Sequence, residues 1–165
     1  MATISEPREL LVNELKAMLY VEQKQAEEVL PQLNREITNT EFKQSVAEHL
    51  EETKQHVANL ERAFQVLGEE AKPDKSHAVD GLVAQHDKVF KNIGADELRD
   101  IFNAGAAAKT EHLEIAAYES MITNAESLGE NEIVNLLQQN LGNEKEALQD
   151  VKKVSEQLAS ETATV

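Results

Sequence analysis

Acidic side chains interrupt the apolar stripes of four segments that have helical periodicity. The clearest case is Glu144, which lies in the middle of a stripe formed by Ile133, Leu137, Leu141, Leu148 and Val151. The corresponding residues on the other three segments are Glu22, Glu52 with His56, and Glu111 with Glu114. An ionised carboxylate in a dry core is unfavourable unless an opposite charge compensates it. We therefore expect bound metal cations at these residues.

The directions and depths of these side chains agree with one another. At 100° per residue, Glu22 lies within about 20° of the axis of its stripe, and Glu111 and Glu144 lie on theirs. His56 also lies on its stripe, whereas Glu52 is nearer the edge. Short loops are expected near 39 and 130, each joining two helices. Measured from these loops, the positions of the side chains along the two joined helices agree within about two helical turns. These side chains are therefore predicted to meet at one level of a helix bundle.

Oxygen ligands combined with one or two imidazoles suit iron or manganese. Ferritin-like di-metal proteins supply a glutamate from each of two helices and Glu-x-x-His from each of the other two. This chain departs from that pattern, because Glu52 and His56 are four residues apart and Ala147 stands three residues after Glu144. Glu114, one turn after Glu111, can compensate as a ligand of the second ion.

Other interpretations stay open at single positions. A lone glutamate on a helix stripe is usually an edge residue that reaches solvent, and it is the coincidence on four segments that favours metal. His49 is either a core histidine with satisfied hydrogen bonds or a group that supports the ligands. Glu114 and His112 flank the axis of their helix at equal angles on opposite sides, so angle alone does not choose between them. Tyr118 is predicted to lie in the core and His86 on the surface.

The elements that position these residues are all helical. Long helices are predicted at about 6–37, 41–67, 96–128 and 131–158. Pro31 is expected to bend the first helix without ending it, and Asn131 to cap the fourth. Short turns join the first helix to the second and the third to the fourth, whereas the crossover 68–95 is long and carries a short helix. One long crossover predicts an all-α, ferritin-like four-helix bundle, with residues 1–165 as a single domain.

Composition excludes several classes of function. The chain has 31 acidic against 16 basic residues and a net charge of −15, which argues against binding to nucleic acid or to anionic membranes. It has no cysteine, so disulfides, thiolate catalysis and cysteine-ligated clusters are excluded. The first residues, 1–11, do not have the pattern of a secretory signal, and no apolar stretch approaches membrane-spanning length. We expect a cytoplasmic protein.

At these residues the chain resembles the YciE/YciF-type ferritin-like family of bacterial stress proteins over nearly its whole length. The matching segments are 49–53, 111–118 and 144–145, together with Tyr20 and Leu30-Pro31. Many relatives carry the first-helix glutamate at the position of Gln23, but the stripe geometry here favours Glu22. The segment Glu111-x-x-Glu114 is also similar to a metal-binding helix of rubrerythrins, which favours Glu114 over His112. The resemblance implies a compact homodimer, not an iron-storage cage, and an association with stress responses.

Together these observations predict two iron or manganese ions per chain, with Glu52 and Glu144 as bridging carboxylates. Glu22 and Glu111 are then terminal ligands, and His56 and Glu114 complete the set. Such a centre would oxidise ferrous iron or reduce peroxide, with dioxygen or peroxide as substrate. The rival hypothesis is a metal-free helical protein with a structural or interaction role in stressed cells. Ala147, in place of a histidine, favours this rival.

Overall fold

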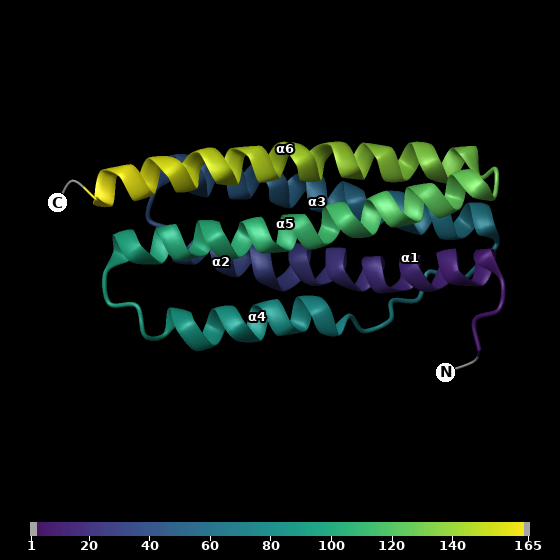
Figure 1. The fold of residues 1–165 in the computed structure, drawn as a ribbon, viewed down its shortest axis with the longest axis horizontal. Coiled ribbons are helices and arrows are strands. Elements are labelled where there is room, and N and C mark those ends of the chain that lie inside the picture. The colour runs from purple at the N-terminus through teal and green to yellow at the C-terminus, as the bar shows by residue number, and fades with distance from the viewer. Residues whose placement is uncertain (1–2, 164–165) are drawn as a thin grey trace.

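The computed structural model describes residues 3–163, and the segments with regular structure are helical throughout this range (Figure 1). The elements are α1 (Pro7–Lys24), the π turn η1 (Gln25–Val29), α2 (Leu30–Glu36), α3 (Thr40–Leu67), α4 (His77–Phe90), α5 (Asp96–Ser127) and α6 (Asn131–Thr162). No strand occurs among the described residues, which confirms the all-α prediction.

Four long rods form the bundle. α5 packs against α6, α6 against α3, α3 against α1, and α1 against α5, so the rods surround one interior. Asn39 caps α3 by accepting a hydrogen bond from the backbone N–H of Phe42 at 2.9 Å. The buried carboxylate of Asp100 accepts hydrogen bonds from the backbone N–H groups of Thr38 and Asn39 at 3.0 and 2.7 Å. α5 thereby holds the short turn between α2 and α3.

The crossover carries α4 along the outside of the bundle, where it lies beside α5 (Figure 1). Gly68 ends α3 in the left-handed region, with φ of 67°, which glycine adopts without strain. The chain then passes α1, where the N–H of Asp74 donates to the carbonyl of Lys16 at 3.0 Å. The hydroxyl of Tyr20 donates to Asp80 at 2.9 Å and so attaches α4 to α1.

The first rod departs from the expected regular helix at the π turn, just before Pro31. In this turn the N–H of Leu30 donates to the carbonyl of Gln25, five residues back. The wider turn directs Gln25 inward, where it is 4% exposed, while the next residue, Ala26, is only half-buried. Pro31 follows in the first turn of α2, where its missing N–H is tolerated. The irregularity predicted as a bend at Pro31 is therefore a wider helical turn, the π turn, just before this proline.

The ends of α6 differ slightly from expectation. The residue before its first turn is Glu130, and no side chain caps the helix, so the prediction that Asn131 is the cap was wrong by one position. The helix also continues to Thr162, beyond the predicted end at 158. Within residues 3–163, no helix is both long and apolar enough to cross a membrane.

The core consists of two apolar clusters with a polar layer between them. One cluster, near the α5–α6 turn, includes Leu15, Phe64 and Leu137. The other, near the α2–α3 turn, includes Leu33 and Phe42. Each rod contributes one half of its length to each cluster, so the side chains in the middle of the rods face one another. The candidate metal ligands lie in this middle layer.

Candidate metal centre

Six ionisable side chains are buried in the middle layer. They are Glu22, Glu111, Glu114, Glu144, His49 and His56, and none is more than 8% exposed. Two groups of three have ligand atoms within 4.8 Å of one another, namely Glu22 with His56 and Glu144, and His49 with Glu111 and Glu144. Glu144 belongs to both groups. The inward direction predicted for Glu22, His56, Glu111, Glu114 and Glu144 is confirmed.

The first group is arranged around the imidazole of His56. Its Nδ1 lies 2.9 Å from Oε1 of Glu144 and 3.5 Å from Oε1 of Glu22. The hydroxyl of Tyr118 donates to the same Glu22 oxygen at 2.5 Å. Tyr118 is fully buried, as predicted, and it fixes the position of the Glu22 carboxylate.

The second group is arranged around the imidazole of His49. Its Nε2 lies 3.5 Å from Oε2 of Glu144 and 3.6 Å from Oε1 of Glu111. The two oxygens of Glu144 therefore face different imidazoles, one from each group. A carboxylate in that position has the geometry of a bridge between two sites.

Glu114 and Glu52 differ in their relation to these groups. Glu114 is 1% exposed whereas His112 is exposed, so the preference for Glu114 as the inward residue is confirmed. The side chain of Glu52 is 42% exposed and its Oε2 lies 3.4 Å from Nδ1 of His49. The structure places Glu52 at the edge of the layer and in neither group of three, whereas Glu144 belongs to both.

Amide side chains form hydrogen bonds with candidate ligands and with Tyr118. Asn140 donates to the hydroxyl of Tyr118 at 2.9 Å and to the carbonyl of His56 at 3.3 Å, while its own oxygen accepts from Asn59 at 2.7 Å. The Nε2 of His56 lies 3.3 Å from the amide oxygen of Asn143. Hydrogen bonds of this kind fix the ring orientation of a ligating histidine and leave its other nitrogen free.

Several oxygen and nitrogen atoms of the layer are buried without a hydrogen-bond partner. They are Oε2 of Glu22, Oε2 of Glu111, Oε1 of Glu114, both carboxylate oxygens of Glu144, and Nδ1 of His56. Nδ1 of His56 and Oε1 of Glu144 are close, but their angles do not make a hydrogen bond. Atoms that converge without pairing fit a set of ligands aimed at a common centre, because buried polar groups otherwise find partners. The residues present therefore fit a pair of cations.

Burial and mutual repulsion set the charge of the layer. Burial and the charge of Glu144 raise the pKa values of Glu22, Glu111 and Glu114 above the ordinary range of a glutamate. Burial also acts to raise the pKa of Glu144, but His56 and His49 outweigh it and lower this pKa. Burial lowers the pKa of His56, while Glu144 and Glu22 oppose this effect and raise it to about 10. Without cations, the carboxyl groups compete for protons.

The sequence prediction was wrong for one histidine, His86, and left the role of another, His49, open. His49, left open there, lies seven residues before His56, which places both on one face of α3 within about 20°, and this spacing could have identified it. His86, predicted to be on the surface, has a side chain only 15% exposed and stacks on Phe90 and Phe102. The seven-residue spacing of His49 and His56 could be read from the sequence. The aromatic neighbours of His86 come from two helices, and the packing of these helices could not be read from it.

Comparison with known proteins places the chain among relatives of the same shape. Protein YciF of Escherichia coli K12 is 35% identical over 130 residues, which cover 76% of each chain. The structure of YcfI from Rhodopseudomonas palustris, provisionally described as a structural protein, superposes with a TM-score of 0.89 and 32% identity over 92% of this chain and 96% of that one. The crystal structure of the E. coli stress protein YciF superposes with a TM-score of 0.89 and 25% identity over 95% and 99%.

These likenesses confirm the resemblance to the YciE/YciF-type family and the helical-bundle fold. The family model described as a domain of unknown function, DUF892, matches residues 6–164, almost the whole chain. The chain therefore belongs to the DUF892 family, with YciF among its relatives.

Proposed function

We propose that this protein binds two iron or manganese ions in the middle layer, with Glu144 as the bridging ligand. The observation that carries the proposal is the position of the two Glu144 oxygens, each facing a different imidazole and neither with a hydrogen-bond partner. Glu22 and His56 complete one site, and Glu111 and His49 the other. Glu114, buried in the same layer with an unpartnered Oε1, is a further candidate ligand.

The charge of the layer supports this proposal. Four carboxyl groups and two imidazoles share a space from which water is excluded. Two divalent cations supply four positive charges, which balance four ionised carboxylates beside neutral imidazoles. Oxygen donors with one imidazole at each ion suit iron or manganese better than the thiolate-preferring metals, and the chain has no cysteine.

Two redox-active ions would supply two electrons, which with two protons reduce dioxygen to hydrogen peroxide or hydrogen peroxide to two molecules of water. The protein's own groups bind and orient the ligands and exclude bulk water. The hydroxyl oxygen of Tyr118 lies 2.5 Å from Oε1 of Glu22 and donates a hydrogen bond that restrains this carboxylate. Because the relative YciF is a stress protein of E. coli, we propose that this chemistry serves a stress response, in a cytoplasmic homodimer.

A metal-free structural role is the second candidate. The pKa shifts favour it in one respect, because protonated Glu111 and Glu114 together with a charged His56 would largely neutralise the layer. Ala147 in place of the histidine of the ferritin-like pattern also favours it. The description of the R. palustris relative agrees with such a role for that protein.

Metal analysis separates the two candidates. The full chain is purified without chelator, reconstituted with Fe²⁺ or Mn²⁺ without oxygen, and analysed by mass spectrometry for bound metal. We expect close to two ions per chain, less than one in Glu144→Ala, and an unchanged content in Glu146→Ala, which alters an exposed glutamate on the same helix. A metal-free wild-type protein after reconstitution supports the structural role. Equal metal content in the two variants contradicts the assignment of Glu144.

A further inference from the structure

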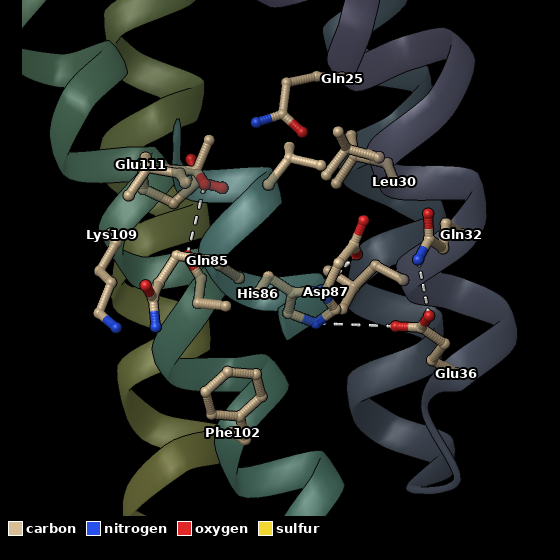
Figure 2. A pocket seen from close by; sticks show the side chains of 17 residues that line it. Gln25, Leu30, Gln32, Glu36, Gln85, His86, Asp87, Phe102, Lys109 and Glu111 are labelled. Atoms are coloured by element: carbon tan, nitrogen blue, oxygen red, sulfur yellow. Dashed lines mark hydrogen bonds and ion pairs between the residues drawn. The ribbon is translucent and has the colours of Figure 1, made fainter. Parts of the chain in front are cut away.

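A narrow pocket lies between α4 and the bundle, beside the metal centre (Figure 2). Its walls come from η1 and α2 on one side, α4 on the second and α5 on the third. Its volume is about 70 Å³, which is room for a few small molecules and well below the roughly 150 Å³ of a cavity that holds benzene. The pocket therefore excludes larger organic substrates.

The walls of the pocket are largely apolar, although the side chains of Gln32, Glu36, His86, Asp87 and Thr110 also line it. Its walls include Leu30, Leu33, Leu82, Phe102 and Ala106. The exposed side chains of Gln85 and Lys109 also line it, which places part of the pocket at the surface of the protein.

One end of the pocket meets the metal centre. Figure 2 shows Gln25 and Glu111 together at this end, with Phe102 and Glu36 toward the other. Glu111 lines the pocket and also lies 3.6 Å from His49 in the second ligand group. The pocket thus connects the protein surface with a residue of the centre itself.

Gln25 is the polar group at this junction. It is 4% exposed and its Oε1 has no hydrogen-bond partner. The π turn places it there, because the wide turn directs this side chain inward. With Glu111, Gln25 forms the polar inner end of a largely apolar pocket, an arrangement that suits a small uncharged molecule passing from the pocket to the ligands.

We propose that this pocket is the route by which dioxygen reaches the metal centre, entering beside α4 and arriving between Gln25 and Glu111. Dioxygen is small and apolar and needs no hydrogen bonds, and so fits the largely apolar walls. The inference rests on the proposed function, because dioxygen needs the two ions at the end of the route.

Xenon tests the pocket without any metal, since it occupies apolar cavities. Crystals of the metal-free protein under xenon pressure should show xenon between Leu33, Phe102 and Ala106. Ala106→Phe fills this space and should abolish the xenon site, whereas Ala116→Phe, at an exposed position of the same helix, should retain it. Absence of xenon from the wild-type pocket overturns the proposal. Should Ala106→Phe fail to fold, Ala107→Leu, which alters another lining residue, replaces it.

Oxidation kinetics test the connection to the centre. Both variants are loaded anaerobically with Fe²⁺ and mixed with dioxygen in a stopped-flow instrument. Ala106→Phe should bind the same amount of iron but oxidise it about tenfold more slowly, while Ala116→Phe matches the wild type. Equal rates overturn the route, and a slowing with peroxide that exceeds the slowing with dioxygen overturns the choice of dioxygen. If no iron binds at all, the proposed function fails, whereas the xenon experiment still decides whether the pocket admits gas.

Discussion

The rings of His49 and His56 lie with their centroids 6.3 Å apart and their planes at 68°, although seven residues separate them along α3. Two turns of one helix thus present an imidazole to each of the two ligand groups. Glu144 approaches both rings from α6. The two proposed metal sites therefore share one helix, α3, and one carboxylate, that of Glu144.

We expect His49→Ala and His56→Ala each to weaken one site more than the other, because each imidazole faces only one oxygen of Glu144. The bound metal should fall from two ions toward one in either variant. Metal analysis after dialysis measures this loss. The control is His77→Ala, which alters an exposed histidine at the start of α4. An unchanged content in His49→Ala would remove His49 from the ligand set.

Metal affinity should rise with pH. Without metal, Glu144 and Glu22 overcome the effect of burial and raise the pKa of His56 to about 10, so this ring is protonated at neutral pH. The raised pKa stabilises the metal-free fold below the unfolded value of about 6.5, and this contribution is lost as pH rises through the folded value. A cation must displace that proton. Mn²⁺ titrations between about pH 6 and 8 should show affinity rising about tenfold per pH unit for each proton released. A pH-independent affinity would show that His56 is already neutral.

Glu114→Gln should stabilise the metal-free protein at neutral pH. Burial and the neighbouring carboxylates raise the pKa of Glu114, so its contribution to stability is present at low pH and is lost as pH rises through the folded pKa. Glutamine mimics the protonated form and removes this loss. Thermal unfolding should show a higher Tm, by about 2–4 °C for each kcal/mol gained. Glu126→Gln, at an exposed position of α5, is the control and should leave Tm unchanged. A lower Tm in Glu114→Gln would mean that the carboxylate is ionised and paired.

Tyr118→Phe should destabilise the fold and loosen Glu22. The variant removes the hydroxyl that donates to Glu22 and accepts from Asn140, at a cost of about 1–3 kcal/mol for buried groups left unpaired. Denaturant unfolding measures the cost, and competition with a chelator measures the loss of metal affinity. Tyr20→Phe is the matched control, because it breaks a hydrogen bond to Asp80 on α4, away from the ligands. Equal metal affinity in the two variants would make Tyr118 a purely structural residue.

Periodicity predicted the bundle and the inward residues because burial on a straight helix follows the angle around its axis. The choice of Glu22 over Gln23 came from this angle, and Glu22 is fully buried while Gln23 is not. The long crossover indicated the connectivity for a similar reason, since loop length limits which helices are neighbours. These features depend on local spacing, which the sequence contains.

The remaining features depend on contacts between helices. Glu52 lies on the edge of its stripe, so its angle alone does not place it. The distance between α3 and α6 decides that it contacts His49 and Asn143 at the edge of the middle layer and does not reach the two ligand groups. Asn140 looks unremarkable in the sequence, yet it joins His56, Tyr118 and Asn59. Such networks arise from three helices at once, and no pattern along one of them reveals them.

The π turn has a consequence for comparing relatives. A π turn amounts to one extra residue accommodated in a helix without a break, so its removal lets the helix become regular again. A relative that is one residue shorter between the positions of Glu22 and Pro31 should have a continuous α-helix there and a different side chain at the inner end of the pocket. A single-residue gap at this place would therefore mark a branch of the family with altered access to its interior.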